Sequence, residues 1–417
     1  MIRKFFLTVS LVLLCTIILT GGFFYYKKQK NRNNEFTIWT IQLKPVAQEI
    51  IEKNISYFKQ VHPQIKVVWV DIPIAEAQKR TLAAILGKNP PDLINLNPDF
   101  SLILAQRGAL EYFSEKESER FIPSTVEMLK YKGKIFALPF YATSSITLYN
   151  KEILNSCGYL TPPKTYEELA QIAQNLKNCS GIYPLAINLN ENDSLAKILN
   201  KYGINSFENE EEIKKAVFVY SMFNDLYKKN LISKDTLTIN HREMAEKYMS
   251  KNALFVVLGS NFLNMVKENA PEIYLKSDVC EQLKPKEGKY DISLMNLIIP
   301  KYAKNKALAH EFANLLTDDK TQLELAKLTN VIPTNKETLE DEYFSQCEEN
   351  LAAKARCMGI EQLKNSGNKD FGVQNKKEIN EAINKTAEKI ILDPNITKEG
   401  IEKEVRALAK KIREFRA

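Results

Sequence analysis

Residues 133–177 read GKIFALPFYATSSITLYNKEILNSCGYLTPPKTYEELAQIAQNLK, and this stretch is the most informative part of the chain about its fold. The apolar run at residues 135–140 predicts a strand. A polar step, Thr143-Ser144-Ser145, separates it from a second strand in which Ile146 and Leu148 alternate with polar residues. Two strands joined by a short polar step are therefore expected at the centre of the chain.

A helix with a well-marked start follows these strands. Tyr149-Asn150-Lys151 opens a first short helix, and Pro162-Pro163 leads to Thr165. Thr165 and Glu168 have the spacing of a capping box, in which the hydroxyl bonds the third helical amide and the carboxylate bonds the cap amide. The apolar stripe of this helix consists of Leu169, Ile172, Ala173 and Leu176. Strand, turn and amphipathic helix together predict an α/β fold.

The sequence before this stretch repeats the alternation of strand and helix. Strands are predicted at residues 36–40, 65–70 and 93–96, with helical patterns between them. This order indicates right-handed βαβ units and a mostly parallel sheet. Ligands of such sheets bind beyond the carboxyl ends of the strands, so the residues that follow each strand are candidates for a site.

A second α/β unit is predicted from about residue 146 to residue 283. It contains an apolar strand at residues 253–258 that ends in Gly259-Ser260-Asn261. The final helix carries an apolar stripe, which we expect to dock on its own lobe. That stripe consists of Ile401, Val405, Leu408, Ile412 and Phe415.

Taken in order, these segments resemble the bacterial extracellular solute-binding proteins, the sugar-type receptors of ABC importers. The resemblance rests first on YNK and PPKTYEEL within residues 149–169. It extends to PDLINLNPDF at residues 91–100 and to YMSKNALFVVLGSNF at residues 248–262. It covers nearly all of residues 35–417, although no single piece is decisive.

The resemblance implies a periplasmic-binding-protein-like fold of type II, in which two α/β lobes flank a cleft and are joined by hinge crossings. The implied first lobe is residues 35–142 plus 290–333, and the second is residues 143–289 plus 334–417. Crossings are expected near residues 141–145, 288–292 and 331–335. Ligand would bind the closed state better than the open state, so closure would be a population shift.

The resemblance also implies a set of ligand contacts. A carboxylate accepts hydrogen bonds from sugar hydroxyls, and an indole covers the apolar face of a sugar ring. The candidates are Trp39, Thr40, Gln42, Asn97 and Asp99 in the first lobe, Tyr141, Thr143 and Ser145 at the hinge, and Ser260 and Asn261 in the second lobe.

Each candidate has a structural alternative. Trp39 can pack at a strand end, and Asp99 can cap the helix that follows it. Asn97 can form a turn with Pro98, and the hinge hydroxyls can serve the hinge alone. Trp69 lies inside an apolar strand and is expected in the core.

Two departures from the family pattern bear on the ligand. Asn261-Phe262 stands where many sugar receptors carry a tryptophan, and Phe371 is the aromatic candidate in the C-terminal part. The chain has two tryptophans, which argues against a platform for a large oligosaccharide. A small polar ligand is favoured, such as a monosaccharide, a disaccharide or a sugar derivative. No concentrated arginine set marks a phosphate or carboxylate ligand.

The N-terminus carries most of the positive charge. Of the net charge of +7, residues 1–34 contribute six and contain no acid, so the remainder is nearly neutral and no nucleic-acid partner is expected. Residues 5–26 form an uncharged stretch of 22 residues between basic flanks, which is long enough to span a bilayer. We expect an uncleaved membrane anchor and tether that hold an extracytoplasmic body. A cleaved signal and a lipoprotein at Cys15 stay open as alternatives.

The five cysteines beyond the anchor have no zinc-ligand spacing. Bridges between Cys157 and Cys179 and between Cys347 and Cys357 fit an oxidising compartment. Scattered buried or free thiols are an equal alternative, and the odd number leaves at least one of the five unpaired.

The sequence contains no motif of an enzyme. GxSxG, HExxH, Walker A and GxGxxG are all absent, and the three histidines stand near no candidate nucleophile. We therefore expect neither catalysis nor a cofactor or metal. The prediction is an extracytoplasmic binding protein that delivers a sugar-like solute to the transmembrane subunits of an ABC permease. The alternative is a membrane-anchored ligand sensor or scaffold with the same fold.

Overall fold

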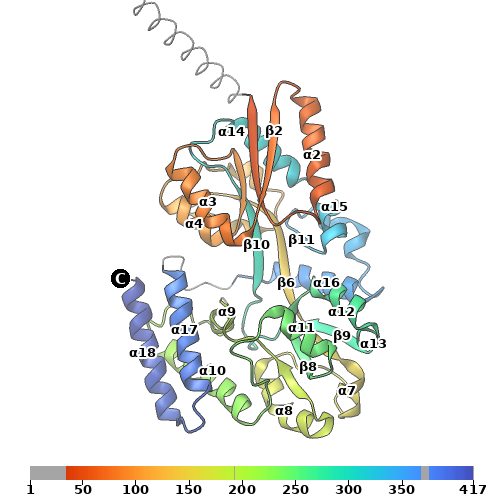
Figure 1. Ribbon diagram of the computed structural model, residues 1–417, viewed down its shortest axis with the longest axis vertical. Helices are drawn as coiled ribbons and strands as arrows, with labels where there is room; N and C mark the ends of the chain where they lie inside the picture. The colour runs from red at the N-terminus through yellow and green to blue at the C-terminus, as the bar shows by residue number, and fades with distance from the viewer. Residues whose placement is uncertain (1–33, 192, 368–374, 417) are drawn as a thin grey trace, which may run out of the picture.

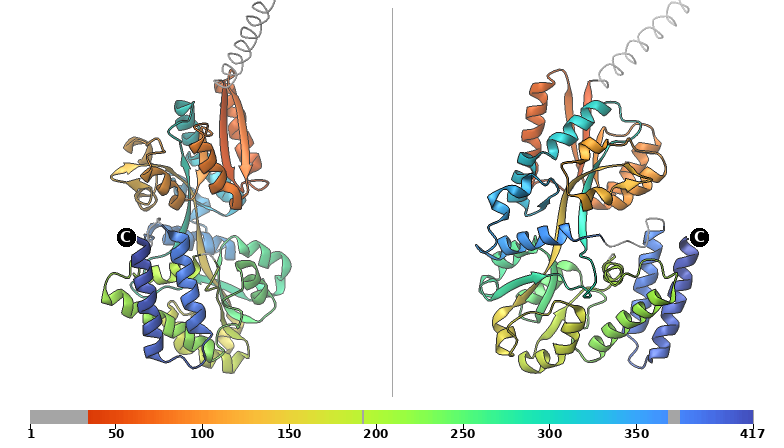
Figure 2. Two further views of the ribbon diagram at one scale, coloured as in Figure 1. Left: turned by 60° about the vertical axis from the view of Figure 1, so that its left-hand side comes forward. Right: turned by 180° about the vertical axis from the view of Figure 1, so that it is seen from behind.

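The computed structural model describes residues 34–191, 193–367 and 375–416. Two α/β lobes are stacked along the long axis of the molecule, and extended strands run between them (Figures 1 and 2). The longer of these is β6 (Leu138–Asn150), and β10 (Ile292–Ile298) lies antiparallel beside its first half. The predicted class of two α/β lobes is confirmed.

One sheet passes through both lobes. Its strand order is β2-β1-β3-β10-β6-β8-β7, and β9 and β11 also pair with β6. The further strands are β1 (Glu35–Ile41), β2 (Lys66–Ile72), β3 (Leu93–Leu96), β7 (Tyr183–Ala186), β8 (Ala253–Gly259), β9 (Ser277–Glu281) and β11 (Ile332–Pro333). The pairing partner of β6 changes from β10 at Ser144 to β8 at Ser145, so the sheet passes from one lobe to the other at this step.

The polar step does not interrupt β6. Two strands were predicted here, but the structure has one, because β10 and β8 supply backbone partners on either side of the step. Ala142 and Ser144 are buried, whereas Thr143 and Ser145 are half-buried. This alternation follows the two-residue period of a strand, which turns the half-buried hydroxyls toward the cleft.

Lobe 1 packs helices on both faces of its part of the sheet. One face is covered by α2 (Gln48–Val61), α14 (Lys306–Leu316) and α15 (Asp319–Thr329), and the other by α3 (Ile74–Leu86) and α4 (Pro98–Gln106). The smaller elements are α5 (Glu115–Ser118), α6 (Pro123–Glu127), β4 (Lys130–Tyr131) and β5 (Lys134–Ile135). Phe36, Phe58 and Phe312 pack their rings together in the centre of this core.

Lobe 2 is built in the same way and ends in a helical layer. Its helices are α7 (Lys151–Ser156), α8 (Tyr166–Ser180), α9 (Ser194–Lys201), α10 (Glu210–Lys228), α11 (His241–Met249), α12 (Phe262–Asn269), α13 (Pro271–Tyr274), α17 (Lys376–Ile391) and α18 (Lys398–Arg416). The apolar stripe of α18 packs into the core of lobe 2, so its docking on its own lobe is confirmed.

The third passage between the lobes comes later than predicted. Thr334 donates its amide to Gln322 Oε1 at 2.8 Å, and Phe344 lies in the lobe-1 core, so the chain stays with lobe 1 through η1 (Thr338–Glu340) and η2 (Glu342–Phe344). The return is made by α16 (Leu351–Lys364). Ala355 packs with the lobe-2 core, whereas Leu363 packs with the lobe-1 core.

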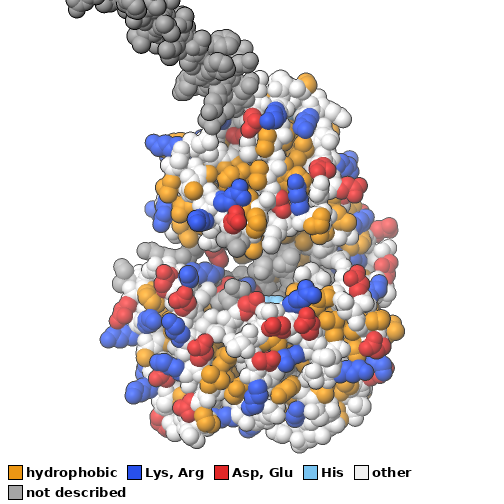
Figure 3. Space-filling view, in the orientation of Figure 1, with side chains coloured by type: hydrophobic (Ala, Val, Ile, Leu, Met, Phe, Trp, Pro, Cys, Tyr) orange, Lys and Arg blue, Asp and Glu red, His pale blue; other side chains and the backbone are white. Residues whose placement is uncertain are grey.

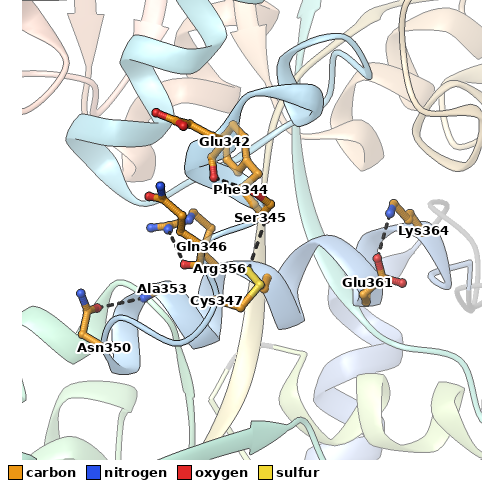
Figure 4. Close-up of a disulfide and its surroundings, with 11 residues drawn as sticks. Glu342, Phe344, Ser345, Gln346, Cys347, Asn350, Ala353, Arg356, Glu361 and Lys364 are labelled. Carbon is orange, nitrogen blue, oxygen red and sulfur yellow. Dashed lines mark hydrogen bonds and ion pairs between the residues drawn. A yellow bond between two sulfur atoms is a disulfide. The ribbon is translucent and has the colours of Figure 1, made fainter.

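Both cysteine pairs that the sequence allowed are disulfides. Cys157–Cys179 joins the end of α7 to α8, and Cys347–Cys357 ties the segment after η2 to α16 (Figure 4). Cys280 is the free cysteine of the described residues.

The expected membrane anchor at residues 5–26 lies outside the described residues, as does Phe371. None of the helices in the described ranges combines the length and the apolarity that a bilayer span requires.

Candidate ligand-binding cleft

A cavity of about 330 Å³ lies where β6 passes between the lobes. Figure 3 shows the molecule hollowed between its two lobes. The cavity walls come from the strands of the hinge, from α9, and from the segments that follow β7 and β8. A larger groove of about 970 Å³ lies on lobe 2 between α8, α10 and α18, and it does not border the hinge. The smaller cavity is therefore the one that borders the hinge.

Hydroxyl groups line the hinge wall of the cavity. Thr143 and Ser145 border it from β6, and the exposed Ser293 borders it from β10. Ser144 lies on the opposite face of β6, where its hydroxyl donates to Gln362 Oε1 at 2.9 Å. The hinge thus offers hydroxyl groups on the cleft side and a buried hydrogen bond on the other.

The α9 wall of the cavity is charged. Asp193 precedes the helix, Lys197 follows one turn later, and Lys201 ends the helix, so the spacing of four residues puts all three on one face. Lys197 Nζ lies 3.4 Å from Asp193 and 3.9 Å from Asp291, which comes from the segment before β10. Burial opposes the charge on Lys197, but the carboxylates of Asp291 and Asp193 raise its pKa overall.

A histidine and a carboxylate border the cavity together beside α11. His241 donates its backbone amide to Glu191 Oε2 at 3.0 Å, and its ring Nδ1 contacts the same oxygen. Asn188 also donates to this carboxylate, at 2.8 Å. Three contacts from two residues thus hold Glu191 at the edge of the cavity. No group of three or more His, Cys, Asp or Glu within the described ranges is arranged to hold a metal ion.

One ion pair links the two lobes across the cleft. Lys376, the first residue of α17, places Nζ 2.6 Å from Asp99 in α4 and 3.7 Å from Asp193. Because Asp193 also pairs with Lys197, a chain of alternating charges runs from lobe 1 across the cleft to Asp291 beside the hinge.

Of the predicted contacts in lobe 1, none borders the cavity in this conformation. Trp39 is half-buried and packs against the lobe-1 core, with Arg80 5.6 Å from its ring centre. Thr40 is fully buried, and its hydroxyl accepts from the Trp69 indole at 2.8 Å and donates to Asp71 at 2.5 Å. Thr40 is therefore buried and hydrogen-bonded within lobe 1 in this conformation.

The other candidates near this lobe also have structural partners. Asn97 caps α4 by accepting from the Phe100 amide at 2.9 Å, and Asp99 forms the interlobe ion pair. Tyr141 packs its ring 5.0 Å from that of Phe140. Burial raises the pKa of Tyr141 to about 12, and the Asp71 carboxylate adds to this effect. The cap of α4 is therefore Asn97 and not Asp99, for which capping was the alternative.

The remaining candidates are exposed or half-buried. Gln42 is exposed on the loop after β1 and has a positive φ of 50°. Ser260 donates its amide to Ser144 O at 3.3 Å, which places the segment after β8 beside the cavity. Asn261 folds back over Gly259, where a Cβ would lie only 2.4 Å from Asn261 Oδ1.

Sequence reasoning missed the charged residues of lobe 2. Asp193, Lys197 and Lys201 recur every fourth residue, a pattern that marks one helix face and was available in the sequence. Asp291 and Glu191 carried no such signal, because loops that are distant in sequence bring them to the cavity.

Comparison with known proteins places this geometry in a family. The family model described as bacterial extracellular solute-binding protein matches residues 41–323. The diacetylchitobiose binding protein DasA of Streptomyces coelicolor is 26% identical over 67% of this chain and 67% of its own length. The maltotriose-binding protein of Pyrococcus abyssi is 26% identical, but the match covers 34% of this chain and only 30% of that protein.

Solved structures match over the whole body. The sugar-binding protein MalE from Xanthomonas citri has a TM-score of 0.75 at 16% identity, and covers 91% of this chain and 97% of that one. Maltose-bound MalE3 of T. maritima has a TM-score of 0.71 at 18% identity, over 91% and 99% of the two chains. At this level of identity the likeness establishes the fold.

Proposed function

Because the chain belongs to the bacterial extracellular solute-binding proteins, we propose that it captures a small sugar or sugar-like solute and delivers it to an ABC importer. The observation that carries the proposal is the cavity at the hinge, with hydroxyls on one wall and alternating charges on the other. A sugar hydroxyl both donates and accepts, so it fits between a carboxylate and an ammonium. Relatives named for maltotriose, mannitol and diacetylchitobiose support this ligand class.

The proposed contacts combine sequence candidates with residues that the structure adds. Thr143, Ser145, Ser260 and Asn261 lie on or beside the cavity wall. Trp39 and Gln42 belong to the lobe that would close over the ligand. The added residues are Asp193, Lys197, Glu191, His241 and Asp291.

The cavity volume supports a ligand of one or two sugar rings. The family and the relatives are binding proteins, so the solute is expected to leave the protein chemically unchanged. The transmembrane subunits of the importer would receive the solute from the closed receptor. Residues 5–26 would keep the receptor at the membrane and raise its effective concentration near the importer.

Thermal-shift screening against monosaccharides, disaccharides and sugar alcohols tests the proposal. A ligand that binds only the folded state raises Tm by mass action, so at least one sugar should give a saturable increase. Asp291→Asn should weaken that response, because it removes a carboxylate from the cavity wall. A panel without a single responding sugar would contradict the proposed ligand class.

The membrane tether has its own test, which is the mass of the protein isolated from its native membrane. The intact chain mass supports an uncleaved anchor. Loss of the residues before Lys27 would replace the anchor with a cleaved signal.

A further inference from the structure

Lys201 is a buried lysine without an ionic partner in the described part of the chain. It is the last residue of α9 and is only 6% exposed. Its ammonium donates to the carbonyl oxygen of Leu283 at 3.2 Å, and no described carboxylate forms an ion pair with it. A lysine ammonium has three N–H donors, so the Leu283 carbonyl leaves two N–H groups to be satisfied.

Lys197 provides an internal comparison, because it lies one turn earlier on the same face. Its ammonium has Asp193 and Asp291 as neighbours, whereas that of Lys201 has a backbone carbonyl. Burial lowers the pKa of Lys201 to about 8, with Asp291 opposing the decrease and Lys197 and Lys284 adding to it. Around Lys201 the positive charges therefore outnumber the negative ones.

The packing holds this ammonium at the edge of the cavity. Gly288 approaches α9 so closely that a Cβ there would lie 2.6 Å from the backbone oxygen of Lys201. The 285–288 turn thus closes over the end of the helix, and Lys201 borders the cavity together with Asp291 and Tyr166. A buried charge without a direct ion pair costs folding free energy, so its presence calls for a compensating role.

We propose that Lys201 is the ligand anchor of the cleft, and that its ammonium donates to an acceptor oxygen of the bound sugar at the hinge end of the cavity. This inference rests on the proposed function and names the part of the ligand that Lys201 recognises. The acceptor belongs either to a neutral hydroxyl or to a carboxylate of an acidic sugar. Both groups supply lone pairs to the two remaining N–H donors.

Lys201→Met tests the anchor, because methionine fills a similar volume without charge. Hydrogen bonds to charged groups typically contribute about 1.5–3 kcal/mol, so the affinity for a responding sugar should fall about tenfold to a hundredfold. In the ligand-free protein Tm should rise or stay constant, because the variant removes an uncompensated buried charge.

The matched control is Lys284→Met. Lys284 is a neighbouring lysine that does not border the cavity and donates to backbone carbonyls of its own loop. Its substitution should change the affinity by less than about twofold, because it removes no proposed contact.

Two pairs of ligands distinguish a hydroxyl acceptor from a carboxylate acceptor. Glucose is compared with glucuronate, and galactose with galacturonate, by calorimetric titration of wild type and Lys201→Met. If wild type binds the acidic sugar more tightly and the variant does not, the acceptor is the carboxylate. If the variant loses affinity equally for the neutral and the acidic sugar, the acceptor is a hydroxyl.

Unchanged sugar affinity in Lys201→Met would contradict the proposed role of Lys201 as ligand anchor. A clear fall in the Tm of the ligand-free variant would also contradict it, because it would show that the ammonium stabilises the fold. Failure of the wild type to bind any sugar would instead overturn the proposed function. The ligand-free Tm comparison remains informative in that case.

Discussion

Among single residues, Lys201 should also affect the stability of the protein in the absence of a ligand. Burial depresses the pKa of Lys201 from 10.5 in an exposed lysine to about 8. Between these values the unfolded chain binds more protons than the folded one, so this group makes stability rise with pH. Below about pH 8 both states are charged, and the full cost of burial applies.

Denaturation of ligand-free protein between pH 7 and pH 10.5 checks this prediction. The stability advantage of Lys201→Met over wild type should be largest near pH 7 and should shrink as pH rises above 8. A difference that stays constant across the range would show that Lys201 does not titrate in this window.

Gly359 shows how closely α16 approaches the hinge. A Cβ at this position would lie 2.7 Å from Ile332 Cδ1 and 3.5 Å from Ser144 Cβ. In an ordinary helix interior, glycine to alanine stabilises by about 1 kcal/mol. Here the added methyl group meets a side chain of β11, so the same change is expected to give no such gain.

A double-mutant cycle tests this contact. Ile332→Val removes the clashing methyl group, at a cost of about 0.5–1.5 kcal/mol. Gly359→Ala should then stabilise the Ile332→Val background by about 1 kcal/mol and should not stabilise wild type. Equal effects in both backgrounds, measured by urea denaturation, would refute the close approach.

At the scale of elements, α16 connects the cores of the two lobes. Its Ala355 end packs on lobe 2, and its Leu363 end packs on lobe 1. Between them Gln362 Oε1 accepts from Ser144 and from Gln282, so α16 is bonded to two of the segments that join the lobes. We infer that α16 braces the back of the hinge.

The Cys347–Cys357 disulfide holds this brace to lobe 1. It closes a loop with a sequence separation of 10, for which chain entropy predicts about 2–3 kcal/mol of stabilisation. The double variant Cys347→Ser/Cys357→Ser should lose about this amount in urea denaturation. The paired variant at Cys157 and Cys179, with a separation of 22, should lose slightly more. If neither variant loses stability, the two disulfides do not contribute to the free energy of unfolding as predicted.

The elements were predicted well wherever a local rule governs them. Thr165 caps α8 as its spacing indicated, with its hydroxyl accepting from the Glu168 amide at 3.0 Å. The Glu168 carboxylate, however, accepts from the Lys164 amide and not from the cap residue. The continuity of β6 escaped prediction, because it depends on partners from residues 253–259 and 292–298 that no local pattern reveals.

The site was predicted less well than the fold, for a physical reason. Candidates in the lobes were placed where strands end, and Thr143 and Ser145 were placed at the hinge. Neither rule points to the charged face of α9. Thr40 follows the first rule and yet is buried, because its neighbours Trp69 and Asp71 use its hydroxyl. Which side chains remain open for a ligand is decided by such tertiary contacts.

In the whole molecule, the Asp99–Lys376 pair joins the lobes in a conformation in which no predicted contact of lobe 1 borders the cavity. A partly exposed pair of this kind stabilises by about 0.2–1 kcal/mol. If the sugar binds a more closed state better, Lys376→Gln removes a contact that favours the present conformation, and sugar affinity should rise by up to about fivefold. High salt should change the affinity of wild type in the same direction and leave the variant less affected.

The control for this pair is Lys377→Gln, the next residue of α17. Lys377 is 86% exposed and pairs only with Glu381 of its own helix in the described structure, at 3.9 Å. It should bind sugar like wild type. The exchange Asp99→Lys/Lys376→Asp should return the affinity part of the way to the wild-type value, and an affinity that stays at the Lys376→Gln value would argue against a direct interlobe pair.

Two hinged lobes that close on a sugar at the cavity beside β6 should make the whole molecule more compact. Small-angle X-ray scattering, recorded while a responding sugar is titrated into the purified protein, detects this change. The radius of gyration should decrease and saturate at one sugar per chain. Saturable binding with a constant radius of gyration would contradict this closure.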